Sequence, residues 1–232
     1  MTRLFTASGG TFVLAASLCA IAIVAPFAMG SAGVPATYLR LGIEHILFGF
    51  DHLLFILALV ILVRDWRRIA VTVTAFALAH SITLAAATLG LVTVRGPLVE
   101  IAIAFSIVLV AAEIVNARRG RSSLTARWPW GVAFCFGLLH GFGFADALAE
   151  VGLPAQAIPV ALVFFNLGVE IGQLAFVAAV LAAGELVRRA MTLPFEPTLL
   201  RSAADRLDIT AACAIGALAT FWLIERTSAL FV

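Results

Sequence analysis

The chain has 232 residues, of which 63% are hydrophobic and 12% charged, with a formal net charge of +2 and a mean hydropathy of +1.11. This composition is more apolar than the core of a water-soluble domain requires, so it predicts a multi-pass membrane protein. All fifteen basic residues are arginines spread over separate connections without interleaved aromatic residues, which argues against a nucleic-acid partner. The three cysteines lie in apolar runs without CxxC spacing, and no disulfide is expected.

Residues 1–33 form the first predicted unit. Arg3, the apolar stretch 12–29 and the small residues that follow it are typical of a secretory signal peptide. The apolar stretch is longer than most signal peptides have, so a retained seventh helix is the alternative. We therefore separate residues 1–33 from a single helical membrane domain at 34–232.

Apolar runs of about 20 residues, the length that crosses roughly 30 Å of hydrocarbon, recur through that domain. The alternating polarity of a membrane barrel is absent, so we expect an all-α, polytopic bundle of transmembrane helices. The predicted spans are residues 40–63, 68–91, 97–116, 128–150, 157–188 and 207–224.

Arginines are concentrated in alternate connections between these spans. Residues 64–68, 118–127 and 188–206 carry most of them, whereas the intervening connections hold Arg95 or no base at all. The positive-inside rule then places the three basic connections in the cytoplasm and the C-terminus outside.

All four histidines lie inside predicted spans, and one of them has an aspartate beside it. His45, Asp51 and His52 fall in the first span, His80 in the second and His140 in the fourth. Ionisable groups at hydrocarbon depth are costly unless they pair with each other, with a proton or with a metal ion. In a straight helix, His45 and His52 would share one face because they are seven residues apart. The spans therefore predict a polar site inside the membrane.

Imidazole nitrogen together with a carboxylate suits a divalent transition metal such as Zn, Ni or Co. We take as candidate metal ligands His45, Asp51, His52, His80 and His140. The fifth span has a polar stripe at Asn166, Glu170 and Gln173, spaced i, i+4, i+7. Further candidates, as ligands or as proton carriers, are Glu170, Glu100, Glu113 and Asp146. For Glu113, a contact that only holds helices together is an equal alternative.

These residues resemble the HxxxxxDH motif of the HupE/UreJ family of bacterial membrane proteins. His45, Asp51 and His52 supply the motif, and the steps Ala79-His80-Ser81 and His140-Gly141 are similar to the second subgroup. The resemblance implies an inner-membrane protein of six to seven helices, viewed as a secondary permease for nickel or cobalt. The chain departs from the family's pattern at two places. Position 46 is an isoleucine where better-studied members have proline. Those members also have a second motif with two histidines, of which this chain retains only His140.

Three functional classes compete for this chain. A transporter would bind a divalent cation from outside at the buried histidines and release it inward. An intramembrane zinc-dependent hydrolase, acting on a lipid or peptide bond, would use the same histidines with an open coordination position, although no HExxH or GxSxG motif supports it. A non-catalytic assembly partner gives no reason for histidines at one depth. The sequence leaves the oligomeric state open.

Overall fold

The computed structural model describes residues 33–144, 157–190 and 197–231. All regular structure in these residues is helical, as expected. The helices are α2 (Val34–Phe48), α3 (Phe50–Val63), α4 (Trp66–Thr88), α5 (Gly96–Arg118), α6 (Leu124–Arg127), α7 (Pro129–Phe142), α9 (Ile158–Ala190) and α10 (Pro197–Ser228).

Four of these helices are long and apolar enough to cross a bilayer. The spanning segments are Trp66–Thr88, Gly96–Arg118, Ile158–Val187 and Ala204–Ser228. They correspond to the second, third, fifth and sixth predicted spans. The helix starts follow local signals, because the Asp65 side chain accepts the backbone N–H groups of Arg67 and Arg68 at the start of α4, and a proline stands in the first turn of α5.

The prediction of one continuous first span was wrong. The chain leaves the helix at Gly49, and α2 and α3 meet there at an angle of 69°, so that together they form one broken span or a re-entrant pair. A Cβ atom at Gly49 would lie 2.6 Å from the carbonyl oxygen of His45. A residue with a Cβ atom would have to displace the backbone here, so glycine permits the break.

The predicted fourth span is described only in part. Helix α7 is an apolar helix of 14 residues, fewer than a crossing requires. The remainder of that predicted span lies outside the described residues, as do residues 1–32 and hence the signal peptide or seventh helix. The described part of the chain thus contains four candidate spans, or five when the bent pair counts as one.

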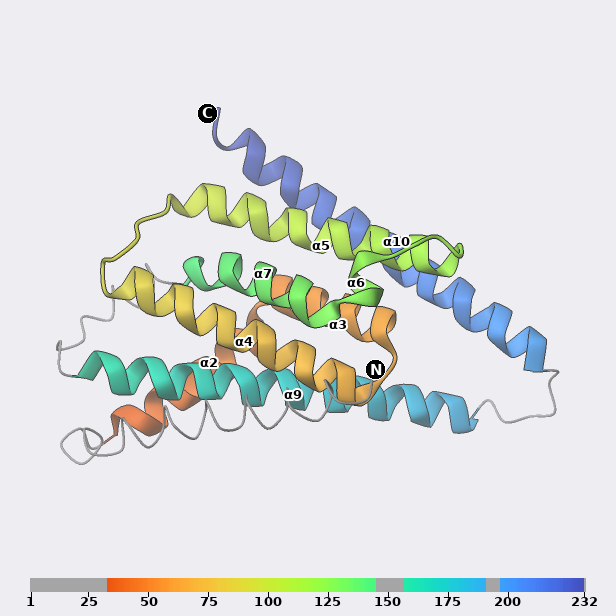
Figure 1. The fold of residues 1–232 in the computed structure, drawn as a ribbon, viewed down its shortest axis with the longest axis horizontal. Helices are drawn as coiled ribbons and strands as arrows, with labels where there is room; N and C mark the ends of the chain where they lie inside the picture. Colours follow the sequence, from red (N-terminus) through yellow and green to blue (C-terminus); the bar gives the residue numbers. More distant parts are fainter. Residues whose placement is uncertain (1–32, 145–156, 191–196, 232) are drawn as a thin grey trace.

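Glycines allow two pairs of helices to pack with their backbones in contact. In the α2 and α9 pair, a Cβ atom on Gly42 would collide with the carbonyl oxygen of Phe165, and one on Gly168 would collide with that of Leu39. In the α4 and α7 pair, Gly137 lies against the backbone of Phe76. Small residues at such positions are the usual basis of close helix packing in membranes. Figure 1 shows these pairs lying along each other.

Helix α3 occupies the middle of the bundle. It contacts α4, α5, α9 and α10 (Figure 1), and its apolar side chains form the centre of the main core, in which Phe55 and Leu59 pack with Phe76, Ile107 and Ile114. A helix that is apolar on all sides is expected to be enclosed by others. The polar residues at the start of α3 are therefore brought into the interior.

The arginine-bearing connections gather at one end of the bundle. Asp208 of α10 forms ion pairs with Arg64 and Arg118, the latter at 2.8 Å. Arg68 donates to the backbone oxygen of Ala126 at 2.9 Å, which ties two of the connections together. The described residues of the connections 64–68 and 118–127 thus lie together, and Asp205 from the end of the third basic connection pairs with both Arg64 and Arg118.

Candidate metal centre

The break at Gly49 brings His45 and His52 together from two different helices. His45 lies in the last turn of α2, and His52 lies in the first turn of α3. Their rings meet edge to face with centroids 4.8 Å apart. In a straight helix, two residues seven positions apart would be separated by about 10 Å along the axis. The bend therefore turns a shared helix face into a direct contact.

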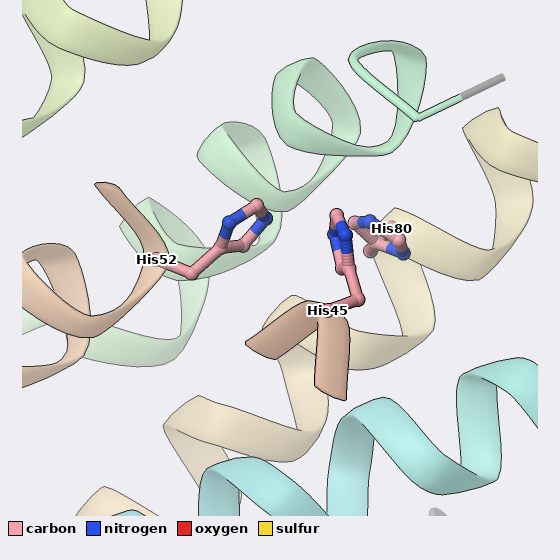
Figure 2. Close-up of side chains that lie close together, drawn as sticks. All are labelled: His45, His52 and His80. Atoms are coloured by element: carbon pink, nitrogen blue, oxygen red, sulfur yellow. The ribbon is translucent and has the colours of Figure 1, made fainter. Parts of the chain in front are cut away.

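His80 of α4 completes a group of three imidazoles. Its side chain is fully buried, and its ring centroid lies 6.0 Å from that of His45 and 6.1 Å from that of His52. One nitrogen from each of the three rings lies within 4.8 Å of the others. Figure 2 shows His52 on one side, facing His45 and His80 on the other. Three helices, α2, α3 and α4, each supply one ring.

The distances between these ring nitrogens are close to those between the nitrogens that coordinate a metal ion. Nitrogens bound tetrahedrally to zinc at about 2.1 Å are about 3.4 Å from each other. To reach this spacing from the observed one, each nitrogen would move toward the centre of the group by less than about 1 Å. Small side-chain rotations achieve this, so His45, His52 and His80 could hold a divalent metal ion.

In all three rings, Nε2 is a nitrogen without a hydrogen-bond partner among the described residues. Nδ1 of His52 lies 3.0 Å from Oδ1 of Asp51, and Nδ1 of His80 lies 3.2 Å from Oδ1 of Asn166. The Nε2 atoms of His45, His52 and His80 are buried and find no hydrogen-bond partner among the described residues. Metal-binding histidines commonly have one ring nitrogen held by a carboxylate or carbonyl oxygen while the other binds the ion.

His140 of α7 stands next to this group without being one of the three. Its ring centroid is 4.8 Å from that of His52. Its Nε2 atom lies 3.2 Å from Oγ of Ser106, whose own hydrogen goes to the backbone oxygen of Ile103 at 2.7 Å. The ring nitrogen must then donate to the hydroxyl oxygen, which leaves Nδ1 with its lone pair and without a partner among the described residues.

A comparison with known protein families finds one that matches most of the chain. A family model described as HupE / UreJ protein matches residues 25–226, which include all four histidines. The chain belongs to the HupE/UreJ family. No curated protein and no solved structure gives a significant match. The resemblance noted in the sequence is thereby confirmed.

Asp51 of this HupE/UreJ protein, a candidate metal ligand in the sequence, lies beside the three grouped imidazoles and is not part of that group. Its Oδ1 atom accepts from the backbone N–H of His52 at 2.9 Å and contacts the ring of the same residue. The carboxylate thus holds a histidine of the centre and adds negative charge beside it. This is the arrangement of an outer partner of a metal ligand.

The other acidic candidates of this HupE/UreJ protein do not join the three imidazoles. Glu170 on α9 lies beside Thr74 of α4. Glu113 accepts from the Ser123 hydroxyl at 2.7 Å and so holds the connection after α5. Glu100 is largely exposed and pairs with Arg226 at 3.7 Å, and Asp146 lies outside the described residues.

Sequence reasoning missed two functional contacts in this HupE/UreJ protein. Asn166 is predicted only as part of a polar stripe, and Ser106 is not among the predicted site residues, yet each hydrogen-bonds to one imidazole. A usable signal was present, because every buried imidazole needs a partner for its N–H group. The partner could not be chosen without knowing which helices touch.

Proposed function

We propose that this protein is a secondary transporter that carries a divalent transition metal ion, Ni, Co or Zn, across the bacterial inner membrane. Two observations carry the proposal: one ring nitrogen from each of His45, His52 and His80 lies within 4.8 Å of the others, and the buried Nε2 atoms of these rings have no hydrogen-bond partner among the described residues. Unpartnered polar atoms in such a setting are costly unless a ligand uses them.

The broken helix supports transport. Discontinuous membrane helices are typical of transporter binding sites, where a helix end contributes to a site near the middle of the bilayer. Here the break at Gly49 lies between two of the three imidazoles. A change in the angle between α2 and α3 would move His45 relative to His52, and this offers a way to form and release the coordination of the cargo ion.

The polar residues of α9 suggest the direction in which the cargo ion is released. Glu170 and Gln173 follow Asn166 at helical spacing, and Gln173 is fully buried with neither side-chain atom hydrogen-bonded among the described residues. Helix α9 runs from these residues toward its end at Ala190, and the basic connection 188–206 follows. In this proposal the ion leaves the histidines along α9 toward the cytoplasm, and Glu170 takes up a proton or holds the ion briefly.

The proposed topology follows the arginines. The end of the bundle that holds Arg64, Arg118 and Asp208 faces the cytoplasm, and the C-terminus lies outside. Six crossings, with 128–150 as the fourth, agree with the alternation of basic and non-basic connections. Residues 1–33 add a signal peptide or a seventh helix.

Uptake into proteoliposomes tests the proposal. Purified protein should take up Ni, Co or Zn, measured by a trapped fluorescent indicator or by radiolabel, and His52→Ala should abolish uptake. Glu44→Gln is the matched control, because Glu44 is a neighbouring acid that pairs with the exposed Arg40. Uptake by His52→Ala at the native rate would overturn the proposal.

A zinc-dependent hydrolase is the second candidate, and one observation favours it. Three histidines with an open fourth position form the ligand set of many catalytic zinc sites, in which the bound water becomes a nucleophile. Stoichiometric zinc binding without any flux, together with cleavage of a lipid or peptide substrate, would select this function over transport.

A further inference from the structure

His80 is held by a residue from a helix that contributes none of the three imidazoles. Oδ1 of Asn166 on α9 lies 3.2 Å from Nδ1 of His80 on α4, across 86 positions of sequence. The His80 side chain has no exposed surface. Water therefore has no direct access to replace the amide as the partner of this nitrogen.

A second hydrogen bond fixes which end of the Asn166 amide faces His80. Nδ2 of Asn166 donates to the backbone oxygen of Leu162 at 2.8 Å, one turn earlier in α9. The flipped amide would place its oxygen against that carbonyl oxygen, with two acceptors facing each other. The amide oxygen must therefore point to His80, where it can only accept.

An accepting oxygen determines the protonation pattern of the ring. Nδ1 of His80 carries the hydrogen, and in the neutral imidazole the lone pair then resides on Nε2. This is the nitrogen that is buried and unpartnered among the described residues. In the other tautomer, an N–H group would point where the ion is expected to bind.

We propose that Asn166 is a positioning residue that selects the Nδ1–H tautomer of His80 and so presents the Nε2 lone pair to the cargo ion. This inference rests on the proposed metal-binding function. A residue that merely joined α4 to α9 could use either end of its amide, whereas here the donor end is occupied by Leu162 and only the acceptor faces the histidine.

Two variants of the full chain separate positioning from packing. Asn166→Leu keeps the approximate volume and removes the acceptor, whereas Asn166→Asp keeps an acceptor at the same place. Affinity for Ni, Co and Zn is measured on purified protein in lipid nanodiscs by competition with a chelator. We expect a loss of about 10- to 100-fold in Asn166→Leu, as is typical when the outer partner of a metal ligand is removed. For Asn166→Asp we expect affinity within about threefold of native, because a carboxyl group protonated on the oxygen that faces the Leu162 carbonyl donates there and keeps the acceptor that orients the ring.

The tautomer provides a readout that a purely structural role would not change. Histidine-selective ¹⁵N NMR of the metal-free native protein should show His80 with a protonated Nδ1 and an unprotonated Nε2, assigned by the signal that His80→Ala removes. Asn166→Leu should shift this signal toward the other tautomer.

The outcomes distinguish this inference from the function on which it rests. A native His80 with its hydrogen on Nε2, or native affinity in Asn166→Leu, overturns the role of Asn166 while metal binding stands. Absence of metal binding by the native protein overturns the proposed function, and the NMR result on the metal-free protein still decides the tautomer. If Asn166→Leu does not fold, the native spectrum and the affinity of Asn166→Asp decide the inference: loss of affinity in a folded Asn166→Asp counts against it.

Discussion

One carboxylate oxygen of Asp51 bonds to His52 twice, at 2.9 Å to its backbone nitrogen and at 3.0 Å to its ring Nδ1. Asp51 lies in the first turn of α3, where a negative charge is favourable. The contact with Nδ1 leaves Nε2 of the same ring without a partner among the described residues. An acidic residue of the first turn therefore also holds an imidazole of the candidate metal centre.

Replacing Asp51 should weaken metal binding in a graded way. Asp51→Asn keeps an oxygen that can accept from the ring but loses the charge, and Asp51→Ala loses both. We expect affinity to fall in the order native, Asp51→Asn, Asp51→Ala, with a total loss of about 10- to 100-fold. Titration calorimetry on purified protein measures it, and Glu44→Gln should remain at the native value. Native affinity in Asp51→Ala would contradict the role of the carboxylate.

The four histidines should separate into two groups when each is replaced by alanine. His45→Ala, His52→Ala and His80→Ala each remove one member of the group whose ring nitrogens lie within 4.8 Å, and one-to-one binding should be lost. His140→Ala should retain that stoichiometry and slow uptake instead, because His140 touches His52 from outside the group. Equilibrium dialysis with metal analysis, paired with uptake rates, makes the comparison. Loss of binding in all four variants alike would place His140 among the ligands.

The break between α2 and α3 should tolerate no side chain. In Gly49→Ala the added Cβ atom would lie 2.6 Å from the carbonyl oxygen of His45 and 3.0 Å from Nδ1 of His52. We expect a lower thermal unfolding midpoint and weakened metal binding, since both imidazoles must shift. Gly131→Ala on α7 is the matched control, because a Cβ atom there meets nothing within 4 Å. Equal behaviour of the two variants would show that the break does not depend on glycine.

Gln173 tests the route of release separately from the binding site. Both polar atoms of its side chain are buried and unpaired among the described residues. If the amide serves the passing ion, Gln173→Leu should slow uptake several-fold and leave equilibrium binding at the histidines unchanged. The same change removes an unsatisfied buried group, so it should also stabilise the fold by about 1–3 kcal/mol. A stabilised variant with native uptake would remove Gln173 from the route.

The sequence was sufficient to predict helices but not the shape of the first span. Hydrophobic length identified α4, α5, α9 and α10, because a membrane imposes one length on every crossing helix. The break at Gly49 was not predictable by this argument, since a single glycine is tolerated inside many membrane helices. It depends on the carbonyl of His45 and on the packing of α2 against α9, which only the assembled bundle specifies.

For the candidate site, the sequence likewise predicted the types of residue that form it, but not which of these residues are in contact. Four histidines inside apolar spans predicted a polar site, and three of their rings come together with nitrogens within 4.8 Å. Which acids join them depends on the direction that each helix presents to its neighbours. Glu113 illustrates this, because it bonds to the connection after its own helix.

Gly42 and Gly168 contain no ionisable group, yet they set how closely His45 approaches the rest of the centre. Each lies where the other helix presents a backbone oxygen, so the backbones of α2 and α9 touch at these two positions. A larger residue at either glycine would push α2, which carries His45, away from α9, which carries Asn166. The spacing of the imidazoles therefore depends on two residues that have no polar side chain.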